Sequence, residues 1–237
     1  MPFGKKPVPQ PASSDFSWDQ KSTWDPADAS EVWKLTQQGV GQVIDAGPGT
    51  LGTFLKELAA NPAHKTYLEI GTWNGLGSTQ CFRKGFVERG DLAGVRLVSL
   101  ECNADKCNQA KALYADFPTI EVTHGTVLRV TDLPTNEEMK AEFPGFNERW
   151  HVVDIANMAQ ANYVTERNFD VVFLDGGEFT TYAEYLILKP SSKVIVCDDS
   201  MVDKCARIRQ ELLADPAWEL MAENPAERNG WCAFRKI

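Results

Sequence analysis

The sequence lacks several features that would direct it to a membrane, to secretion or to nucleic acid. It has no run of roughly eighteen apolar residues, and Pro7, Pro9 and Pro11 stand where a signal peptide would have an apolar core. The six cysteines include no C-x-x-C pair, which favours reduced thiols and a cytoplasmic protein. The sequence also has no excess of basic over acidic residues. The formal net charge of -9 argues against a phosphate-backbone partner, so neither nucleic acid nor a membrane is expected as a partner.

What the sequence does contain indicates one domain preceded by an arm. A chain of 237 residues with 43% hydrophobic content suits a single large α/β domain. Residues 1–28 are rich in Pro, Ser, Asp and Lys and carry few large apolar groups, so they predict a flexible N-terminal arm. Folding of this arm over a site as a lid is left open. Residues 29–237 form the predicted domain, with an insertion at about 130–168.

The order of the predicted elements indicates a parallel sheet. A helix is expected at 31–43, and apolar residues at helical spacing predict another that starts at Leu51. Strands are expected at 66–71, 96–101, 119–124, 169–175, 193–198, 218–222 and 230–235, and further helices at 78–89, 104–116, 182–188 and 201–213. This alternation predicts an α/β fold with a doubly wound, mostly parallel seven-stranded sheet that ends in an antiparallel hairpin. The insertion is too long for a plain connection, so we expect it to carry small elements or a function of its own.

A glycine-rich loop follows the first predicted strand. Its pattern is E-x-G-x-x-x-G-x-G-S, beginning at Glu69 and ending at Ser78. Glycines let the backbone turn tightly and approach a ligand, and Ser78 or Thr79 is expected to cap the following helix. The dinucleotide fingerprint G-x-G-x-x-G fails in both frames, because Trp73 and Gln80 stand at required glycines. A nicotinamide cofactor is therefore disfavoured.

This loop resembles the first motif of the class I methyltransferases, which have a Rossmann-like fold. The resemblance covers most of the chain from about Leu51 onward. It implies that the loop backbone lies against the methionine part of S-adenosylmethionine and that the acid at the strand end helps to place the cofactor indirectly. The cofactor-binding positions implied in the loop are Glu69, Gly71, Thr72, Gly75, Gly77 and Ser78.

Two further positions fit the adenosine part of such a cofactor. Glu101 ends the second strand, where an acid can accept two hydrogen bonds from a ribose diol. Thr126 lies where the resemblance puts the loop that contacts adenine, and it could bond a base edge. His124 nearby fits a hydrogen-bonded strand-end residue equally well.

Acids also follow the fourth and fifth large strands. Asp175 corresponds to the acid that stands beside the transferred methyl in the resembled family, and Asp198 and Asp199 end the next strand. Because carboxyl ends of parallel strands meet at one edge, these three should converge, and they then need a cation or raised pKa values. They resemble the Mg²⁺ ligands of metal-assisted O-methyltransferases, including the cephalosporin hydroxylase type. In the alternative interpretation, Asp199 or Ser200 simply caps a helix that starts near Met201.

One position departs from the family pattern. Many relatives have D-G-x-H where this chain has Asp175-Gly176-Gly177-Glu178, so the expected histidine base is missing. Glu178 could serve as the base, join a metal site, pair with Lys204 or remain a solvated loop acid. Asp175, Glu178 and Lys204 are the candidate catalytic residues, and Tyr182 and Glu184 are further candidates for contacts with the acceptor.

The sequence therefore predicts an S-adenosylmethionine-dependent methyltransferase acting on a hydroxyl of a small molecule, such as a sugar or a natural-product intermediate. Assistance by Mg²⁺ at Asp175, Asp198 and Asp199 is left open. The alternative is a non-catalytic S-adenosylmethionine-binding or scaffold protein of the same fold. A homo-oligomer is compatible with the sequence.

Overall fold

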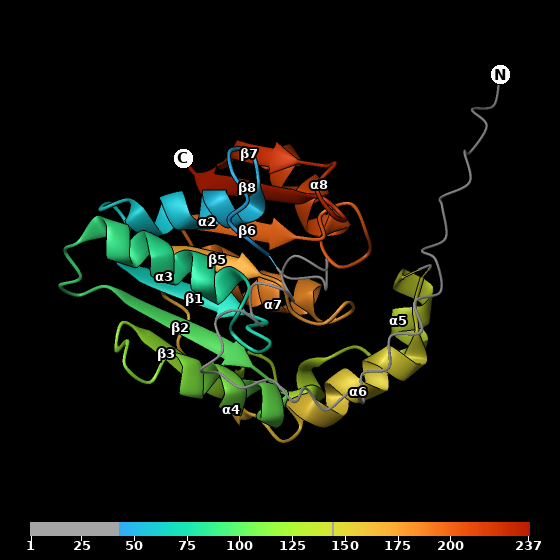
Figure 1. The fold of residues 1–237 in the computed structure, drawn as a ribbon. Coiled ribbons are helices and arrows are strands. Elements are labelled where there is room, and N and C mark those ends of the chain that lie inside the picture. The colour runs from blue at the N-terminus through green and yellow to red at the C-terminus, as the bar shows by residue number, and fades with distance from the viewer. Residues whose placement is uncertain (1–42, 144) are drawn as a thin grey trace.

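A computed structural model describes residues 43–143 and 145–237 of the chain (Figure 1). The predicted arm at 1–28, and the helix expected at 31–43 except for its last residue, lie outside the described residues. None of the helices within those ranges is long and apolar enough to cross a membrane. All six cysteines are unpaired thiols, and all except Cys102 are buried.

The centre of the molecule is one sheet of eight strands in the order β4-β3-β2-β1-β5-β6-β8-β7. The strands are β1 (Thr66–Ile70), β2 (Arg96–Glu101), β3 (Ile120–Thr126), β4 (Asn162–Tyr163), β5 (Val171–Leu174), β6 (Val194–Asp198), β7 (Trp218–Asn224) and β8 (Trp231–Lys236). β1 to β6 run parallel, and β8 lies antiparallel between β6 and β7. The predicted mostly parallel sheet with a C-terminal hairpin is confirmed. Its strand number is eight rather than seven, because the two-residue β4 in the insertion pairs with β3.

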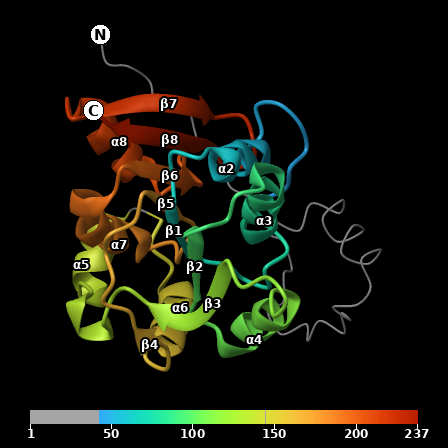
Figure 2. The same ribbon diagram turned by 90° about the vertical axis from the view of Figure 1, so that its left-hand side faces the viewer.

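Helices cover both faces of the sheet (Figures 1 and 2). They are α2 (Leu51–Ala60), α3 (Ser78–Arg89), α4 (Ala104–Leu113), α5 (Asn136–Glu142), α6 (Glu148–Met158), α7 (Thr181–Leu188) and α8 (Ala206–Ala214), with 3₁₀ turns η1 (Val130–Asp132) and η2 (Lys189–Ser191). In β5, Val171 and Phe173 pack into the core beneath α2 and α3, while Val172 and Leu174 pack into the core beneath α7 and α8. This strand is apolar on both sides because a parallel sheet is buried on both faces.

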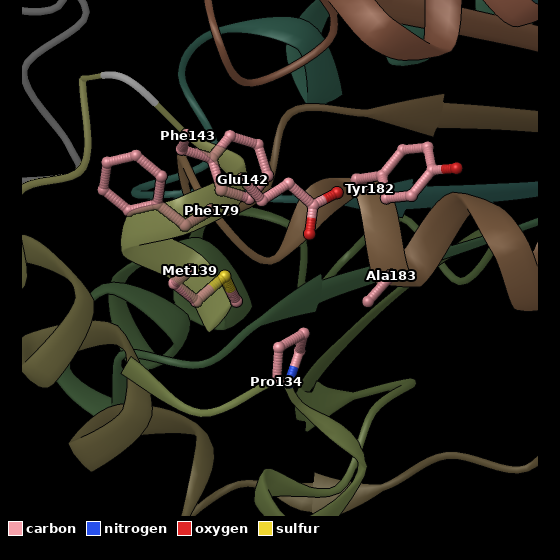
Figure 3. A pocket seen from close by; sticks show the side chains of 7 residues that line it. All are labelled: Pro134, Met139, Glu142, Phe143, Phe179, Tyr182 and Ala183. Carbon is pink, nitrogen blue, oxygen red and sulfur yellow. The ribbon is translucent and has the colours of Figure 1, made fainter. Parts of the chain in front are cut away.

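The predicted insertion contains helices α5 and α6, which lie beyond the carboxyl ends of the parallel strands (Figure 1). Met139 of α5 and Phe143, which follows that helix, form a small apolar cluster with Phe179, which precedes α7. Between these elements is a cavity of about 20 Å³ that Pro134 and Tyr182 also line (Figure 3). A space of that size holds about one water molecule, so it is a packing defect rather than a ligand pocket.

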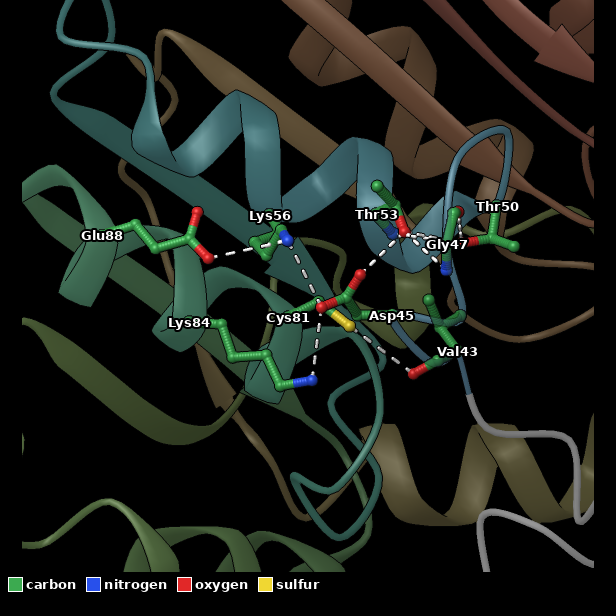
Figure 4. A network of polar contacts seen from close by, with 9 residues as sticks. All are labelled: Val43, Asp45, Gly47, Thr50, Thr53, Lys56, Cys81, Lys84 and Glu88. Carbon is green, nitrogen blue, oxygen red and sulfur yellow. Dashed lines mark hydrogen bonds and ion pairs between the residues drawn. The ribbon is translucent and has the colours of Figure 1, made fainter.

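A polar network fixes α2 against α3 (Figure 4). Asp45 Oδ1 accepts a hydrogen bond of 2.7 Å from Thr53, and its Oδ2 lies 3.5 Å from Lys56 Nζ and 3.4 Å from Lys84 Nζ. Thr53 and Lys56 belong to α2, whereas Lys84 belongs to α3. The network therefore ties α3, the helix that follows the glycine-rich loop, to the preceding helix.

The helix expected at 201–213 starts later than predicted. α8 begins at Ala206, and its N-cap residue Cys205 makes no side-chain capping bond. The segment after β6 forms turns instead, including the bond from the Val202 amide to the Asp199 carbonyl. Asp199 and Ser200 therefore do not cap this helix, and that alternative interpretation of the acids is wrong.

Candidate active site

Glu69 lies inside β1 and anchors the glycine-rich loop. Its side chain is fully buried. Its Oε2 accepts hydrogen bonds from Thr72 Oγ1 at 2.9 Å, from Thr79 Oγ1 at 2.7 Å and from Ser99, and its Oε1 accepts one from Ser78. Burial raises the pKa of this carboxyl, while the hydroxyl donors oppose the rise. Glu69 thus holds the loop through these hydrogen bonds, and its indirect part in placing a cofactor stays a prediction.

The start of α3 differs from the prediction. Gly77 is the N-cap residue, and it supplies no side-chain bond to the helix. The hydroxyls of Ser78 and Thr79, expected to cap the helix, instead donate to Glu69. A cap is the residue before the helix and accepts a backbone N–H, whereas Ser78 and Thr79 are the first two residues of α3.

The loop brings its backbone against neighbouring segments at two glycines. Gly71 has a φ of +90°, and a Cβ at this position would lie 2.0 Å from the carbonyl oxygen of Asp175. Gly75 has a φ of +83°, and its Cβ would lie 2.9 Å from Cε2 of Tyr114, whose hydroxyl donates to the Gly75 carbonyl. Side chains are excluded at both positions by conformation and by space. The first glycine therefore sets the loop directly beside the segment that carries Asp175.

Glu101, the predicted ribose ligand, ends β2 next to the loop. Its side chain is only 5% exposed. Oε2 accepts a hydrogen bond of 2.7 Å from the Trp73 amide, and Oε1 accepts one of 2.7 Å from the Asn103 amide. Burial raises the pKa of Glu101 and these amides oppose the rise. Binding of a ribose by Glu101 stays a prediction.

The two strand-end residues predicted near adenine are hydrogen-bonded locally. Thr126 ends β3, is buried, and accepts a hydrogen bond of 3.1 Å from the Leu128 amide. His124 Nε2 lies 2.9 Å from the carbonyl oxygen of Cys102. The contact of Thr126 with a base stays a prediction, and His124 fits the simpler interpretation of a hydrogen-bonded strand residue.

The three acids predicted to converge do so. One oxygen atom from each of Asp175, Asp198 and Asp199 lies within 4.8 Å of the others. Asp198 ends β6, and Asp175 follows β5. Asp199 has a φ of +54°, a left-handed conformation that is unfavourable for a residue other than glycine. Its contacts with neighbouring side chains hold it in this conformation.

Two cationic side chains lie against this cluster of three acids. Lys204 Nζ lies 2.8 Å from Asp175 Oδ1 and 2.7 Å from Asp199 Oδ2. Arg228 Nη2, from the turn between β7 and β8, lies 2.9 Å from Asp198 Oδ2 as an ion pair without hydrogen-bond geometry. The prediction that the acids need a cation or raised pKa values is met by side chains of the protein itself.

The charges in this cluster shift one another's pKa values. Burial raises the pKa of Asp175, and burial together with Asp175 raises the pKa of Asp198 to about 8. For Asp199 burial acts in the same direction, but Lys204 and Asn229 outweigh it and lower its pKa. Lys204 has a pKa well above its ordinary value, because the two aspartates outweigh its own desolvation. Lys204 is therefore a permanent cation here and not a proton acceptor.

The occupied oxygens leave little for a divalent cation. Asn229 Nδ2 donates to Asp199 Oδ1 at 3.0 Å, and the Asp199 amide donates to Asp198 Oδ1 at 2.9 Å. With the two cations counted, only Oδ2 of Asp175 has no partner within the described ranges. Mg²⁺ requires several oxygen ligands in near-octahedral geometry. The predicted metal ligands are therefore brought together, but as arranged they do not fit a divalent cation.

Glu178, which replaces the family's histidine, is half-buried beside this cluster. Burial raises the pKa of Glu178, with Lys204 opposing the rise. Lys204 makes its ion pairs with Asp175 and Asp199, while Glu178 interacts with the charge of Lys204 and with its backbone amide. Tyr182, predicted for acceptor contacts, instead donates its hydroxyl to Glu211 at 2.6 Å.

A second pair of acids, Asp154 and Glu184, lies near the strand ends. The sequence pointed to Glu184 only, as a residue for acceptor contacts, and did not point to Asp154. A Cβ on Gly177 would lie 2.6 Å from Asp154 Oδ2, and one on Gly176 would lie 2.5 Å from Glu184 Oε2. The Glu184 Oε2 atom is buried without a hydrogen-bond partner. Burial raises the pKa of Asp154 to about 6, and burial plus repulsion from Asp154 raises that of Glu184 to about 8. No motif marks Asp154, since only the packing of α6 brings it to the strand ends.

No protein-family model matches the sequence, and no curated protein sequence matches it. Solved structures do match. An O-methyltransferase from Bacillus cereus in complex with SAH is 19% identical, with 87% of this chain and 90% of that chain covered and a TM-score of 0.53. A putative caffeoyl-CoA O-methyltransferase from Staphylococcus aureus is 16% identical, with 87% and 92% covered and a TM-score of 0.53. The O-methyltransferase TomG from Streptomyces achromogenes, in complex with SAM, is 14% identical, with 88% of each chain covered and a TM-score of 0.53.

The chain has the Rossmann-like methyltransferase fold. This confirms the predicted fold class and, at the level of fold, the resemblance to the class I methyltransferases. In this methyltransferase fold the glycine-rich loop, Glu101 and the acid cluster all lie at the carboxyl ends of parallel strands. Open α/β sheets bind their ligands along that edge.

Proposed function

We propose that this protein is an S-adenosylmethionine-dependent methyltransferase that acts on a hydroxyl of a small molecule. The observation that carries the proposal is the fully buried Glu69 carboxylate, which holds a glycine-rich loop with its Gly71 backbone against Asp175. Similar folds bound to SAH and SAM support this cofactor, since the solved examples include O-methyltransferases. The site lies at the edge of the sheet where the parallel strands end, which is where α/β sheets bind small molecules. It is not a basic face of the kind that binds nucleic acid.

In this proposal the cofactor lies along the strand ends from β5 to β3. Its methionine part contacts the loop backbone from Gly71 to Ser78, including Thr72, Gly75 and Gly77. The ribose diol donates to the carboxylate of Glu101, and the adenine lies near Thr126. The sulfonium group then faces Asp175, whose negative charge complements it.

The transfer is an in-line displacement. A lone pair of the acceptor oxygen forms the new C–O bond to the methyl carbon, the C–S bond breaks, and its electron pair stays on sulfur as a neutral thioether. The hydroxyl proton passes to Glu178, whose burial raises its pKa and makes it a better base than an exposed carboxylate. A divalent cation is not part of this proposal, because Lys204 and Arg228 already pair with the acids.

Calorimetric titration with S-adenosylhomocysteine tests the cofactor. The wild-type protein is expected to bind it, and Gly75→Ala is expected to bind at least about tenfold more weakly, because the new Cβ displaces the loop towards Tyr114. Gly94→Ala is the matched control, since Gly94 also has a positive φ but open space around its Cβ. A folded wild-type protein that does not bind S-adenosylhomocysteine refutes the proposed function.

Transfer of a labelled methyl group from S-adenosylmethionine to a panel of sugars, phenols and catechols tests catalysis. Asp175→Asn is expected to lower turnover on any accepted compound by about 100-fold, as a loss of positioning and electrostatic stabilisation. Asp105→Asn, on the first turn of α4, is the control. Binding of the cofactor without any product across the panel favours the alternative, a non-catalytic scaffold that lost its acceptor chemistry along with the histidine. The cytoplasmic location and a homo-oligomer stay predictions.

A further inference from the structure

We propose that the ammonium group of Lys204 is the resident cation of the acid cluster and takes the place of a divalent metal ion there. This inference goes beyond the proposed function, because it assigns to one side chain the charge that a bound ion would supply. Three carboxylates in contact would otherwise favour a cation from solvent.

The position of Lys204 carries the inference. Its side chain is 11% exposed, and its Nζ bridges Asp175 Oδ1 at 2.8 Å and Asp199 Oδ2 at 2.7 Å, two oxygens that come from the ends of different strands. A metal ion bound to these oxygens would have to share them with the ammonium at close range. Two like charges at that separation in a buried site repel strongly, so the ammonium and the ion exclude each other.

The remaining oxygens support the same conclusion. Asp198 is held by Arg228 and by the Asp199 amide, and the second oxygen of Asp199 is held by Asn229. Each of these contacts would compete with a metal ion for the oxygens of the acids. The site therefore already holds two cations of the protein without one.

Lys204 also has bonding capacity left for an acceptor. An ammonium has three N–H donors, and two of them point to Asp175 and Asp199. The third can donate to the acceptor oxygen, while the hydroxyl proton of the acceptor points to Glu178. As the proton moves to Glu178, this N–H stabilises the negative charge that develops on the oxygen. This contact with the acceptor rests on the proposed function, whereas the exclusion of metal does not.

Binding of Mn²⁺ measured by electron paramagnetic resonance, and of Mg²⁺ by calorimetry, tests the inference on three proteins. The wild type is expected to show no saturable binding. Lys204→Ala removes the charge and opens space, so it is expected to bind Mn²⁺ at least about tenfold more tightly than the wild type and to gain thermal stability when Mg²⁺ is added. Lys204→Met removes the charge but keeps a side chain of similar length in the space, so its gain should be smaller.

Saturable Mn²⁺ binding by the wild-type protein that Asp198→Asn abolishes would overturn the inference, whatever the variants do. So would a folded Lys204→Ala protein that binds Mn²⁺ no better than the wild type. These measurements need neither S-adenosylmethionine nor an acceptor. A protein that fails to bind S-adenosylhomocysteine but gives the expected metal results loses its proposed function and keeps this inference.

Discussion

The buried carboxyl of Glu184 makes folding stability depend on pH in a defined direction. Burial and repulsion from Asp154 raise its pKa from 4.5 to about 8. The unfolded chain therefore releases this proton near pH 4.5 while the folded chain still holds it. The contribution of this group to stability is complete below pH 4.5, falls as the pH rises towards 8, and is lost above that.

Replacement of Glu184 by glutamine removes this effect. Between about pH 5 and pH 9 the stability of Glu184→Gln relative to the wild type should rise by about 4 kcal/mol, because a tenfold difference in proton affinity between the folded and unfolded chains corresponds to about 1.4 kcal/mol. Chemical denaturation at several pH values measures the difference. Any constant effect of the new amide on packing cancels between pH values, so only the change with pH matters.

The neighbouring acid supplies an internal check. Asp154→Asn removes the repulsion that contributes to the raised pKa of Glu184, so the loss of stability should then occur at lower pH than in the wild type. A stability difference between Glu184→Gln and the wild type that is the same at pH 5 and pH 9 would refute the reasoning. It would mean that the carboxyl is solvated and titrates as in the unfolded chain.

Three other substitutions follow from the same contacts. Burial raises the pKa of Asp170, but its bonds with Lys193 and two backbone amides outweigh burial and lower the pKa to about 2. Asp170 should therefore stabilise the protein above pH 4. The cost of Asp170→Asn in denaturation experiments should disappear as the pH falls to about 2. Glu69→Gln replaces an acceptor of hydroxyl hydrogen bonds with an amide donor, and should cost about 2 to 4 kcal/mol by denaturation and weaken S-adenosylhomocysteine binding in calorimetry. Arg228→Ala should destabilise the protein by about 2 kcal/mol at pH 9 and by less at pH 6. The reason is that the pKa of Asp198 is about 8 and only its ionised form needs the guanidinium. Equal losses of stability at both pH values in denaturation experiments would contradict this.

The parts of the fold that the sequence predicted are those with strong local patterns. The structure contains the strand around Leu68, the glycine-rich loop and the amphipathic helix from Leu51. The strand and the helix have a clear apolar pattern, and glycines mark the loop. Convergence of Asp175 with Asp198 was also predictable, since the carboxyl ends of adjacent parallel strands share one edge.

The features that sequence patterns did not predict depend on long-range packing. The two-residue β4 is too short to leave a pattern, and its pairing with β3 exists only because the insertion returns to the sheet edge. The segment after Asp199 forms turns until Ala206, and within it Lys204 contacts the acids. Asp154 and Arg228 carry no motif, so only their packing brings them to the strand ends.

The turn between β7 and β8 links the electrostatics of the site to the order in which the protein assembles. Arg228 and Asn229 lie just before β8, so they can reach Asp198 and Asp199 when β8 pairs with β6. Until then Asp198 and Asp199 keep their charges hydrated, and burying them is unfavourable. The hairpin thus completes the sheet and the charge balance in one step, and any partial opening that releases it would admit water to the acids. Amide hydrogen exchange at β8 and at the acid-bearing segment should therefore proceed together, as one cooperative unit.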